Sequence, residues 1–501
     1  MDSTPTTEPL GPRTYGNWRK PLSPGIGGIG AAGTLLLFTG MLLFIIVMFV
    51  SMVMAVGVAV VFGIALLPLV FRDKHGRNGL QRITARVAWI RGKLAGKHLF
   101  RSGPLSEIPS GTCELPGVGA ASSVYASTDA HGRPFALVSF PGVGHHTVVL
   151  SCEADGASLV DGDQIDTWVG YWGQWLGQLG HEPGLVGASV TIEAAPDSGE
   201  RLRREVTDNL AADAPTVAID VLREVVRSYP KGSARLSTWV ALTYSGVSRI
   251  SGARMSVDEV AAGIGSRLPG LCDALQMTGA GPAQPMTSRE LAEAVRVAYD
   301  PRAAATLERS HGEGEEIPWS ETGPMSAVEA WDHYRHDSGW SVTWSMSEAP
   351  RGGVFSSILL RLVLPHADIL RKRVTLVYRP HDPGTAARLV ERDRKDALFK
   401  AKQAKIPNAR DSVAVRAAEQ AAHEEATGAG VVRFGMFVTA TVDSAEALKL
   451  AASTVDSLAS SSRVLLRRVF GAQATAFAAT LPLGLVLPSH LHVPQKLRES
   501  I

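Results

Sequence analysis

The most constraining feature of this sequence is a long stretch without charge near its N-terminus. No Asp, Glu, Lys or Arg occurs between Pro21 and Phe71. A helix crosses the hydrocarbon core of a bilayer, about 30 Å thick, with about 20 apolar residues. A single helix as long as this stretch would measure roughly 75 Å. The stretch therefore predicts a hairpin of two membrane spans, residues 29–50 and 52–70, that turns near Ser51. A pair of buried core helices is the less favoured alternative, because core helices of soluble proteins usually keep a polar face.

Basic residues flank this stretch on both sides. Arg13, Arg19 and Lys20 precede it, and the segment that follows it, 72–101, holds nine basic residues against one acid, Asp73. By the positive-inside rule, both ends of the stretch face the cytoplasm. We therefore expect a cell (inner) membrane protein with two spans and with both termini and the soluble domains in the cytoplasm. The residues expected to contact the membrane surface are Arg72, Lys74, Arg77, Arg82, Arg86, Arg91, Lys93 and Lys97.

Composition agrees with a cytoplasmic location. The three cysteines, Cys113, Cys152 and Cys272, are far apart, odd in number and in no metal-binding spacing. This usage favours a reducing compartment and a chain without a disulfide framework. The net charge of +2 over 501 residues indicates no nucleic-acid surface outside residues 72–101, so we expect no direct binding to nucleic acid.

The basic segment itself is predicted to form an amphipathic helix. Between residues 76 and 97, apolar side chains recur at steps of three and four, and most of the basic residues fall outside this stripe. The stripe consists of Leu80, Ile83, Val87, Ile90 and Leu94. A basic amphipathic helix beside a membrane span tends to lie on an anionic leaflet. The alternative, equally favoured, is that the stripe packs on the domain that follows.

The soluble part contains two stretches with one order of elements. Once a helical excursion at 200–228 is set aside, residues 145–299 read as β-α-β-β-α-β. Residues 341–482 read the same way once the excursion at 383–427 is set aside. This is the order of a ferredoxin-like unit, an antiparallel sheet with helices on one face. The predicted fold class is therefore α+β: a two-span N-terminal transmembrane helical hairpin followed by two ferredoxin-like (βαββαβ) lobes with helical insertions.

These patterns divide the chain into seven parts. The second excursion is expected to be a solvated helical hairpin or, alternatively, an arm that touches a partner. The predicted parts are a cytoplasmic N-terminal tail (1–24), the transmembrane hairpin (25–71), the basic amphipathic helix (72–100), a first α/β lobe (101–300), a linker (301–325), a second α/β lobe (326–482) with its long helical insertion (383–427), and a C-terminal tail (483–501).

No strong catalytic motif occurs in the sequence. The glycine run at 25–30 has the letters of a dinucleotide-binding loop, but it opens a membrane span and no strand precedes it. A phosphate-binding G-x-x-x-x-G-K-[ST] loop does not occur. His333, His336 and Asp337 form the densest polar cluster, which would hold a metal only if further ligands joined it; otherwise it is a hydrogen-bonded loop. We therefore expect no enzyme and no catalytic, cofactor-binding or metal residue.

Three tryptophans, at 168, 172 and 175, recur on one face of a predicted helix over residues 164–179. Such a stripe usually packs on the core of its own domain. The less favoured alternative is that it is buried against another protein.

Several short runs resemble parts of known secretion proteins. The N-terminal region, from Arg13-Thr-Tyr-Gly16 to the basic helix, resembles the small inner-membrane subunits of type IV secretion systems, the PrgI or VirB-three-like group. Residues 135–482 resemble the N-terminal, non-motor half of the VirB-type (CagE/TrbE/VirB) conjugation ATPases. The runs that carry this second resemblance lie at 285–301, 437–446 and 471–482.

Together the resemblances imply a membrane-anchored structural (scaffold) component of an actinobacterial conjugative, type IV-like secretion apparatus. In the ATPase family a motor domain follows the closing Leu-Pro pair, whereas here 19 residues follow Pro482. A separate cytoplasmic VirB-type ATPase is therefore the expected partner, beside membrane lipids and other secretion subunits in a homo- or hetero-oligomer. No catalytic residue can be carried over. The alternatives are an EccE-like component of a type VII secretion system and, less favoured, a membrane-tethered enzyme with its site at residues 333–337.

Overall fold

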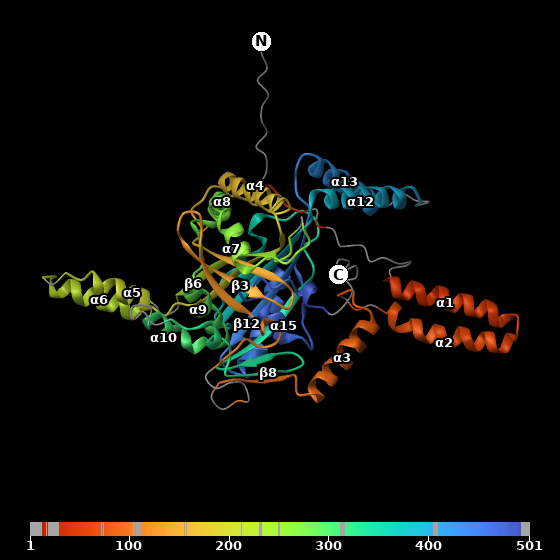
Figure 1. Ribbon diagram of the computed structural model, residues 1–501, viewed down its shortest axis with the longest axis horizontal. Coiled ribbons are helices and arrows are strands. Elements are labelled where there is room, and N and C mark those ends of the chain that lie inside the picture. The colour runs from red at the N-terminus through yellow and green to blue at the C-terminus, as the bar shows by residue number, and fades with distance from the viewer. Residues whose placement is uncertain are drawn as a thin grey trace, which may run out of the picture.

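A computed structural model describes most of the chain around one large sheet (Figure 1). The described residues are 13–16, 18, 30–71, 73, 75–103, 106, 112–154, 156, 158–211, 213–229, 233–248, 251–310, 316–403 and 409–491. The helices are α1 Gly30–Met48, α2 Met52–Val70, α3 Gly79–Leu94, α4 Gly162–Gln178, α5 Glu200–Asp208, α6 Thr216–Ser228, α7 Val257–Gly265, α8 Leu268–Leu275, α9 Ser288–Tyr299, α10 Ala304–Ser310, α11 Leu360–Val363, α12 Pro383–Gln403, α13 Ala409–Ala426, α14 Ala447–Ser461 and α15 Gln473–Ala478.

The sheet has 13 strands, and every pairing in it is antiparallel. Its main path is β1-β8-β9-β10-β12-β11-β5-β6-β4-β3-β2, while β13 pairs with β10 and β7 pairs with β4. The strands are β1 Leu99–Arg101, β2 Ser123–Thr128, β3 Pro134–Phe140, β4 His145–Cys152, β5 Leu185–Pro196, β6 Ala234–Ser245, β7 Ala283–Pro285, β8 Ser326–Glu329, β9 Tyr334–His336, β10 Gly339–Glu348, β11 Arg371–Pro380, β12 Val432–Val442 and β13 Leu465–Arg468.

The prediction of two ferredoxin-like lobes is wrong, because the strands of both stretches belong to this one sheet. Strands β5 and β11, one from each stretch, pair from Ala188↔Tyr378 to Ala194↔Lys372. We call this β5–β11 pairing the seam. A period-2 pattern identifies a strand, but it does not say which partner lies beside that strand. An edge strand with unpaired backbone groups is a ready template for another strand, and here β5 and β11 satisfy each other.

Buried polar side chains cross the seam. The Thr191 and Thr375 hydroxyls lie 2.9 Å apart. The carboxylate of Glu193 accepts from Arg371 at 2.6 Å and lies 3.5 Å from the guanidinium of Arg373. All three charged side chains are buried, and burial lowers the pKa of Arg373 to about 10. An ion cluster this deep in the sheet is costly unless every member is paired, so Glu193 is central to the seam.

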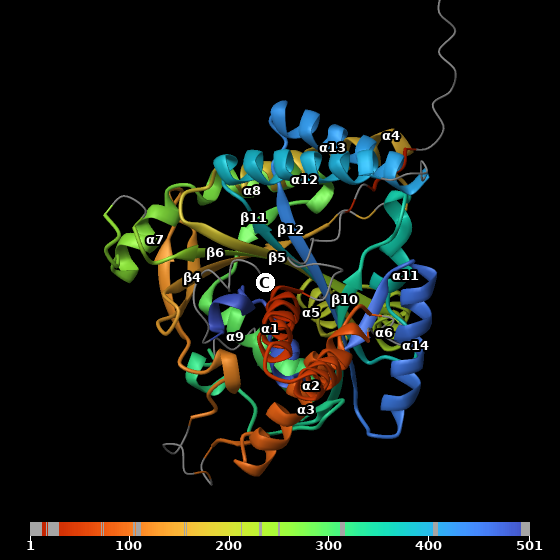
Figure 2. The same ribbon diagram turned by 90° about the vertical axis from the view of Figure 1, so that its right-hand side faces the viewer.

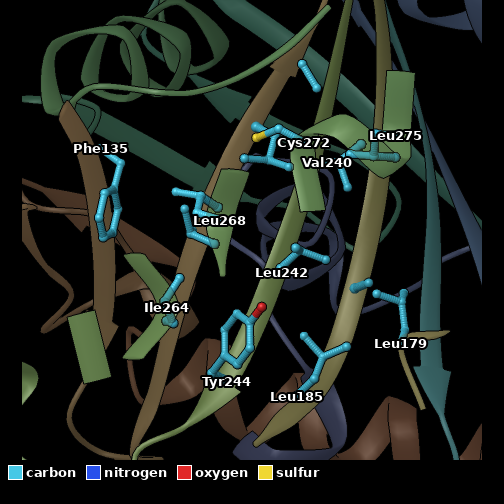
Figure 3. Close-up of a cluster of buried hydrophobic side chains, with 14 of the residues drawn as sticks. Phe135, Leu179, Leu185, Val240, Leu242, Tyr244, Ile264, Leu268, Cys272 and Leu275 are labelled. Atoms are coloured by element: carbon cyan, nitrogen blue, oxygen red, sulfur yellow. The ribbon is translucent and has the colours of Figure 1, made fainter. Parts of the chain in front are cut away.

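The two faces of the sheet are covered differently. On one face α4, α7 and α8 cover the β4–β5 side, and α11 and α14 cover the β10–β12 side. Figure 3 shows part of the first cluster, where Leu268, Cys272 and Leu275 of α8 face Leu242 and neighbouring residues of the strands. Figure 2 shows α14 and α11 together beside β10, and α4 near α12 and α13.

The opposite face holds α9, α15 and the segment that follows α15. Leu481, Leu483 and Leu485 belong to the buried apolar cluster here. The Thr243 hydroxyl donates to the carbonyl oxygen of Gly484 at 2.6 Å. Gly484 lies so close to the sheet that a Cβ atom there would meet Thr147 and Thr243 at 2.4 Å, which explains a glycine at this position.

Three pairs of helices project from the body (Figure 1). The pairs α1–α2 and α5–α6 point away from each other at opposite sides, and α12–α13 lies at a third position next to α4. The excursions predicted at 200–228 and 383–427 correspond to the last two pairs.

The prediction of a two-span hairpin is also wrong. Among the described residues, only Met52–Leu69 is long and apolar enough to cross a membrane. The apolar part of α1, Thr34–Met48, is shorter; at about 1.5 Å per residue it measures roughly 22 Å, less than the hydrocarbon thickness. The prediction counted a charge-free length, but residues 21–29 of that length lie outside the described part of the chain.

Candidate membrane interface

The helices α1 and α2 expose many large apolar side chains. They pack side by side where Gly40 admits the ring of Phe62, which a Cβ atom at this position would meet at 2.5 Å. Away from this contact, their large apolar residues are exposed. These exposed residues include Leu35, Phe38, Met41, Leu42 and Ile46 on α1 and Met52, Val53, Val56, Val60, Val61, Ile64 and Leu67 on α2. A contiguous apolar surface of this kind marks a contact with a membrane or another protein.

Helix α3 follows α2 closely and touches it. A Cβ atom at Gly79 would meet the carbonyl oxygen of Pro68 at 2.9 Å, so a small residue is needed at this contact. The side chain of Asn78 caps the helix by accepting from the backbone N–H of Gln81 at 3.0 Å, which satisfies one of the free donors of the first turn.

One face of α3 rests on the body through Trp89. Its ring meets Trp331 edge-on at 5.4 Å, and Trp331 in turn stacks on Phe470 at 5.7 Å. The guanidinium of Arg86 lies 4.4 Å from the centre of the Trp331 ring. Aromatic pairs and cation–π contacts of this geometry each contribute about 0.5–1 kcal/mol, so α3 is held by specific contacts.

The apolar stripe of α3 lies away from this contact. Leu80, Ile83, Val87, Ile90 and Leu94 are 41 to 83 % exposed. The alternative in which the stripe packs on the following domain is therefore wrong, because a different face of α3, the one that carries Trp89, packs on the body. Beside α1 and α2, the stripe adds a third apolar surface to the same end of the molecule (Figure 1).

The eight basic residues predicted at the membrane surface fall into four groups. Arg72 and Lys74 lie outside the described residues. Arg86 and Lys93 approach the Trp89 ring, at 5.4 and 5.3 Å from its centre. The exposed residues without such a contact are Arg82, Arg91 and Lys97. Arg77 is half-buried, and burial lowers the pKa of its guanidinium.

The polar cluster at 333–337 is engaged in structural contacts. His336 is fully buried; its Nδ1 donates to the carbonyl oxygen of Tyr299 at 2.6 Å and its Nε2 accepts from the Ser341 hydroxyl at 2.8 Å. Burial lowers the pKa of His336 to about 4, so the ring is neutral. Asp337 pairs with Arg296 at 2.9 Å. Among the residues that the structure describes, no three His, Cys, Asp or Glu side chains gather as metal ligands.

Two of the three tryptophans of α4 belong to the core, as predicted, while Trp168 is half-buried against Gly279. Trp175 is buried, and its ring stacks on that of Trp172 at 5.0 Å. Trp172 also meets Tyr378 of β11 at 6.0 Å. In contrast, the glycine run at 25–30 lies outside the described residues except for Gly30, where α1 begins.

Sequence reasoning missed two basic residues that reach the same end of the molecule. Arg467 and Arg468 lie in β13, almost 400 residues beyond Arg77, yet they share a cavity with it. Nothing in the local sequence distinguishes them from other arginines on a short strand. Only the pairing of β13 with β10, together with the docking of α3, brings them to the end of the molecule that carries α1, α2 and α3.

Comparison with known proteins places one family over this end of the chain. The sequence model of a family described as a domain of unknown function, DUF8461, matches residues 22–81. This part contains all of the charge-free stretch except Pro21, and the start of α3. A comparison with curated proteins found no match.

Proposed function

We propose that this protein is a membrane-anchored, non-catalytic scaffold of a conjugative, type IV-like secretion apparatus. In this proposal the sheet-based body stands at the cytoplasmic face of the membrane and docks a separate ATPase, which supplies the energy. Anchoring in the membrane and scaffolding are supported by different observations.

The anchoring part is supported by one observation above all: α2 and the stripe of α3 offer apolar side chains to the outside at the same end of the molecule. Trp89 fixes the orientation of α3, so its stripe stays turned away from the body. Burying this apolar surface in a bilayer removes it from water, which stabilises the arrangement by about 25 cal/mol per Å².

The orientation is supported by charge. Arg77, Arg82, Arg86, Arg91 and Lys93 follow α2 within 25 residues. Basic residues in such a position are retained on the cytoplasmic side and are attracted to anionic lipids. We therefore place the body, which follows this segment, in the cytoplasm.

The scaffolding part rests on the resemblance to the VirB-type ATPases, in which the matching half lies before the motor domain. The projecting pairs α5–α6 and α12–α13 add surface to the body at a distance from the membrane-facing end (Figure 1). On α6, the valines 217, 221 and 225 are exposed at helical spacing, a stripe that a partner helix could cover.

The test is affinity purification of the tagged full-length chain from detergent-solubilised membranes, with its neighbouring genes co-expressed. We expect an ATPase with a Walker A motif to co-purify, and we expect no ATP hydrolysis by this chain alone. A tagged membrane protein of unrelated function serves as the control. Recovery of the chain alone would contradict the scaffold, and ATP hydrolysis by the isolated chain would contradict its non-catalytic role. Recovery with type VII components would replace it by the EccE-like alternative.

A further inference from the structure

A cavity of about 860 Å³ lies between the membrane-facing segments and the body. Its walls come from the loop after α2, from α3, and from the β13 region together with the end of α14. It therefore lies where the chain passes from the apolar helices to the sheet.

The cavity is rich in guanidinium groups. Arg77, Arg82, Arg467 and Arg468 line it, against two carboxylates, Asp73 and Asp456. Arg468 is paired with Asp332 at 3.5 Å. In the described part of the chain, no ion pair joins Arg77, Arg82 or Arg467 to a carboxylate. The cavity thus holds more positive than negative charge.

The positive charges of Arg77 and Arg467 repel each other. Burial and, to a smaller extent, the nearby charge of Arg77 lower the pKa of Arg467 to about 10, while Asp73 opposes this shift. Both side chains are half-buried. Like charges held together and partly shielded from water are stabilised by an anion between them.

The walls of the cavity are held in place. The ring Nδ1 of His75 lies 3.2 Å from the Ser347 hydroxyl, which donates to the carbonyl oxygen of Leu465 at 2.9 Å. Arg467 donates to the Ser345 hydroxyl at 3.3 Å. Trp331 and Phe470 stack on another wall. An arginine fork held in this way needs little reordering when it binds an oxyanion.

We propose that this cavity binds the phosphate group of an anionic lipid headgroup, with Arg77 and Arg467 as its main donors. Planar guanidiniums match phosphate oxygens with two parallel hydrogen bonds. A free phosphate offers the same chemistry, but the cavity begins at the end of α2 and lies beside α3, so a lipid of the cytoplasmic leaflet is the nearest source. This inference rests on the proposed anchoring.

The test uses the full-length protein in dodecylmaltoside micelles. The probes are dihexanoyl-phosphatidylglycerol, dihexanoyl-phosphatidylcholine and inorganic phosphate, each titrated by calorimetry and by tryptophan fluorescence, because Trp331 and Trp344 line the cavity. We expect phosphatidylglycerol to bind, phosphatidylcholine to show no saturable binding, and inorganic phosphate to compete only weakly.

The key variant is Arg77→Gln combined with Arg467→Gln. A hydrogen bond to a charged group is worth about tenfold or more in affinity, so we expect the affinity for phosphatidylglycerol to fall at least about tenfold for each arginine removed. The matched control is Arg223→Gln combined with Arg227→Gln, which removes the same charge from the exposed surface of α6, outside the cavity, and is expected to leave the affinity within about twofold. If circular dichroism shows that the Gln variant is unfolded, the variant Arg77→Lys with Arg467→Lys is used instead. It keeps the charge but loses the planar guanidinium groups, and it is expected to bind phosphatidylglycerol more weakly than the wild type.

Equal affinity in the cavity variants and the control would overturn the inference. Binding of inorganic phosphate as tight as that of phosphatidylglycerol would replace the lipid by a soluble phosphate compound. The proposed anchoring is judged separately, by whether the wild-type chain sediments with membranes. A chain that sediments with membranes but shows no preference for phosphatidylglycerol contradicts the cavity inference alone.

Discussion

The seam and the end of the molecule that carries α1, α2 and α3 expose and bury opposite kinds of side chain. At the seam, charged side chains are buried and held by partners: Glu193 between Arg371 and Arg373. At the other end, apolar side chains of α1, α2 and α3 are exposed. The seam has the chemistry of a protein interior in water, where buried charges must be paired. The other end is complete only when something apolar covers it. The two regions should therefore respond differently to substitution, to pH and to lipid.

The largest expected effect is at the seam. Replacing Glu193 by Ala leaves two guanidiniums buried without their carboxylate, and such a loss costs about 3–5 kcal/mol. We expect the free energy of unfolding in urea to fall by this amount. Glu224→Ala, which breaks an exposed pair with Arg227 on α6, is the control and should change it little. Equal effects of the two variants would show that the seam does not depend on its ion cluster.

The next effect concerns α2. An arginine at the centre of a membrane span costs about 2.5–3.5 kcal/mol on insertion scales, so Val61→Arg should move a large part of the chain from the membrane pellet to the soluble or aggregated fraction. The control is Val217→Arg, which places the same charge on an exposed valine of α6. If both variants sediment with membranes as the wild type does, α2 is not the anchor.

The third prediction concerns the pH dependence of stability, which depends on the buried His336. The pKa of His336 in the folded protein is about 4, below its ordinary value of 6.5. The unfolded chain therefore binds more protons, and stability falls as the pH drops from about 6.5 toward 4. By pH 5 this residue alone should remove about 2 kcal/mol. In urea unfolding, the His336→Gln variant should be less stable than the wild type at pH 7. Its free energy of unfolding should fall less steeply as the pH is lowered. A loss as steep as that of the wild type would contradict this assignment.

The smallest effect is expected where the two regions meet. Trp89→Ala removes an edge-on contact with Trp331 and weakens the hold on α3 by about 1 kcal/mol. We expect faster amide hydrogen exchange in α3 and unchanged exchange in β5 and β11. Tyr229→Ala, at an exposed aromatic residue after α6, is the control. Faster exchange at the seam would mean that α3 and the sheet open together.

The sequence predicts where individual helices and strands lie better than it predicts which of them pack side by side. The strand expected at 145–151 is β4, and the apolar stripe of α3 is visible in its spacing, because both depend on side chains close along the chain. The seam depends on which edges meet, and no local pattern encodes that choice. In the same way, Arg467 joins Arg77 only after β13 pairs with β10 and Trp89 docks α3. The error in the number of spans came from counting uncharged residues rather than the length of each apolar helix.

The most direct test of the account is a protease experiment on membrane vesicles of both orientations. The account holds that α2 and α3 fix the body to the cytoplasmic face. It predicts that alkaline carbonate leaves the full-length chain in the membrane, and that protease cuts the body in inside-out vesicles but not in intact right-side-out vesicles. Release of the chain by carbonate, or cleavage of the body in right-side-out vesicles, would contradict the account.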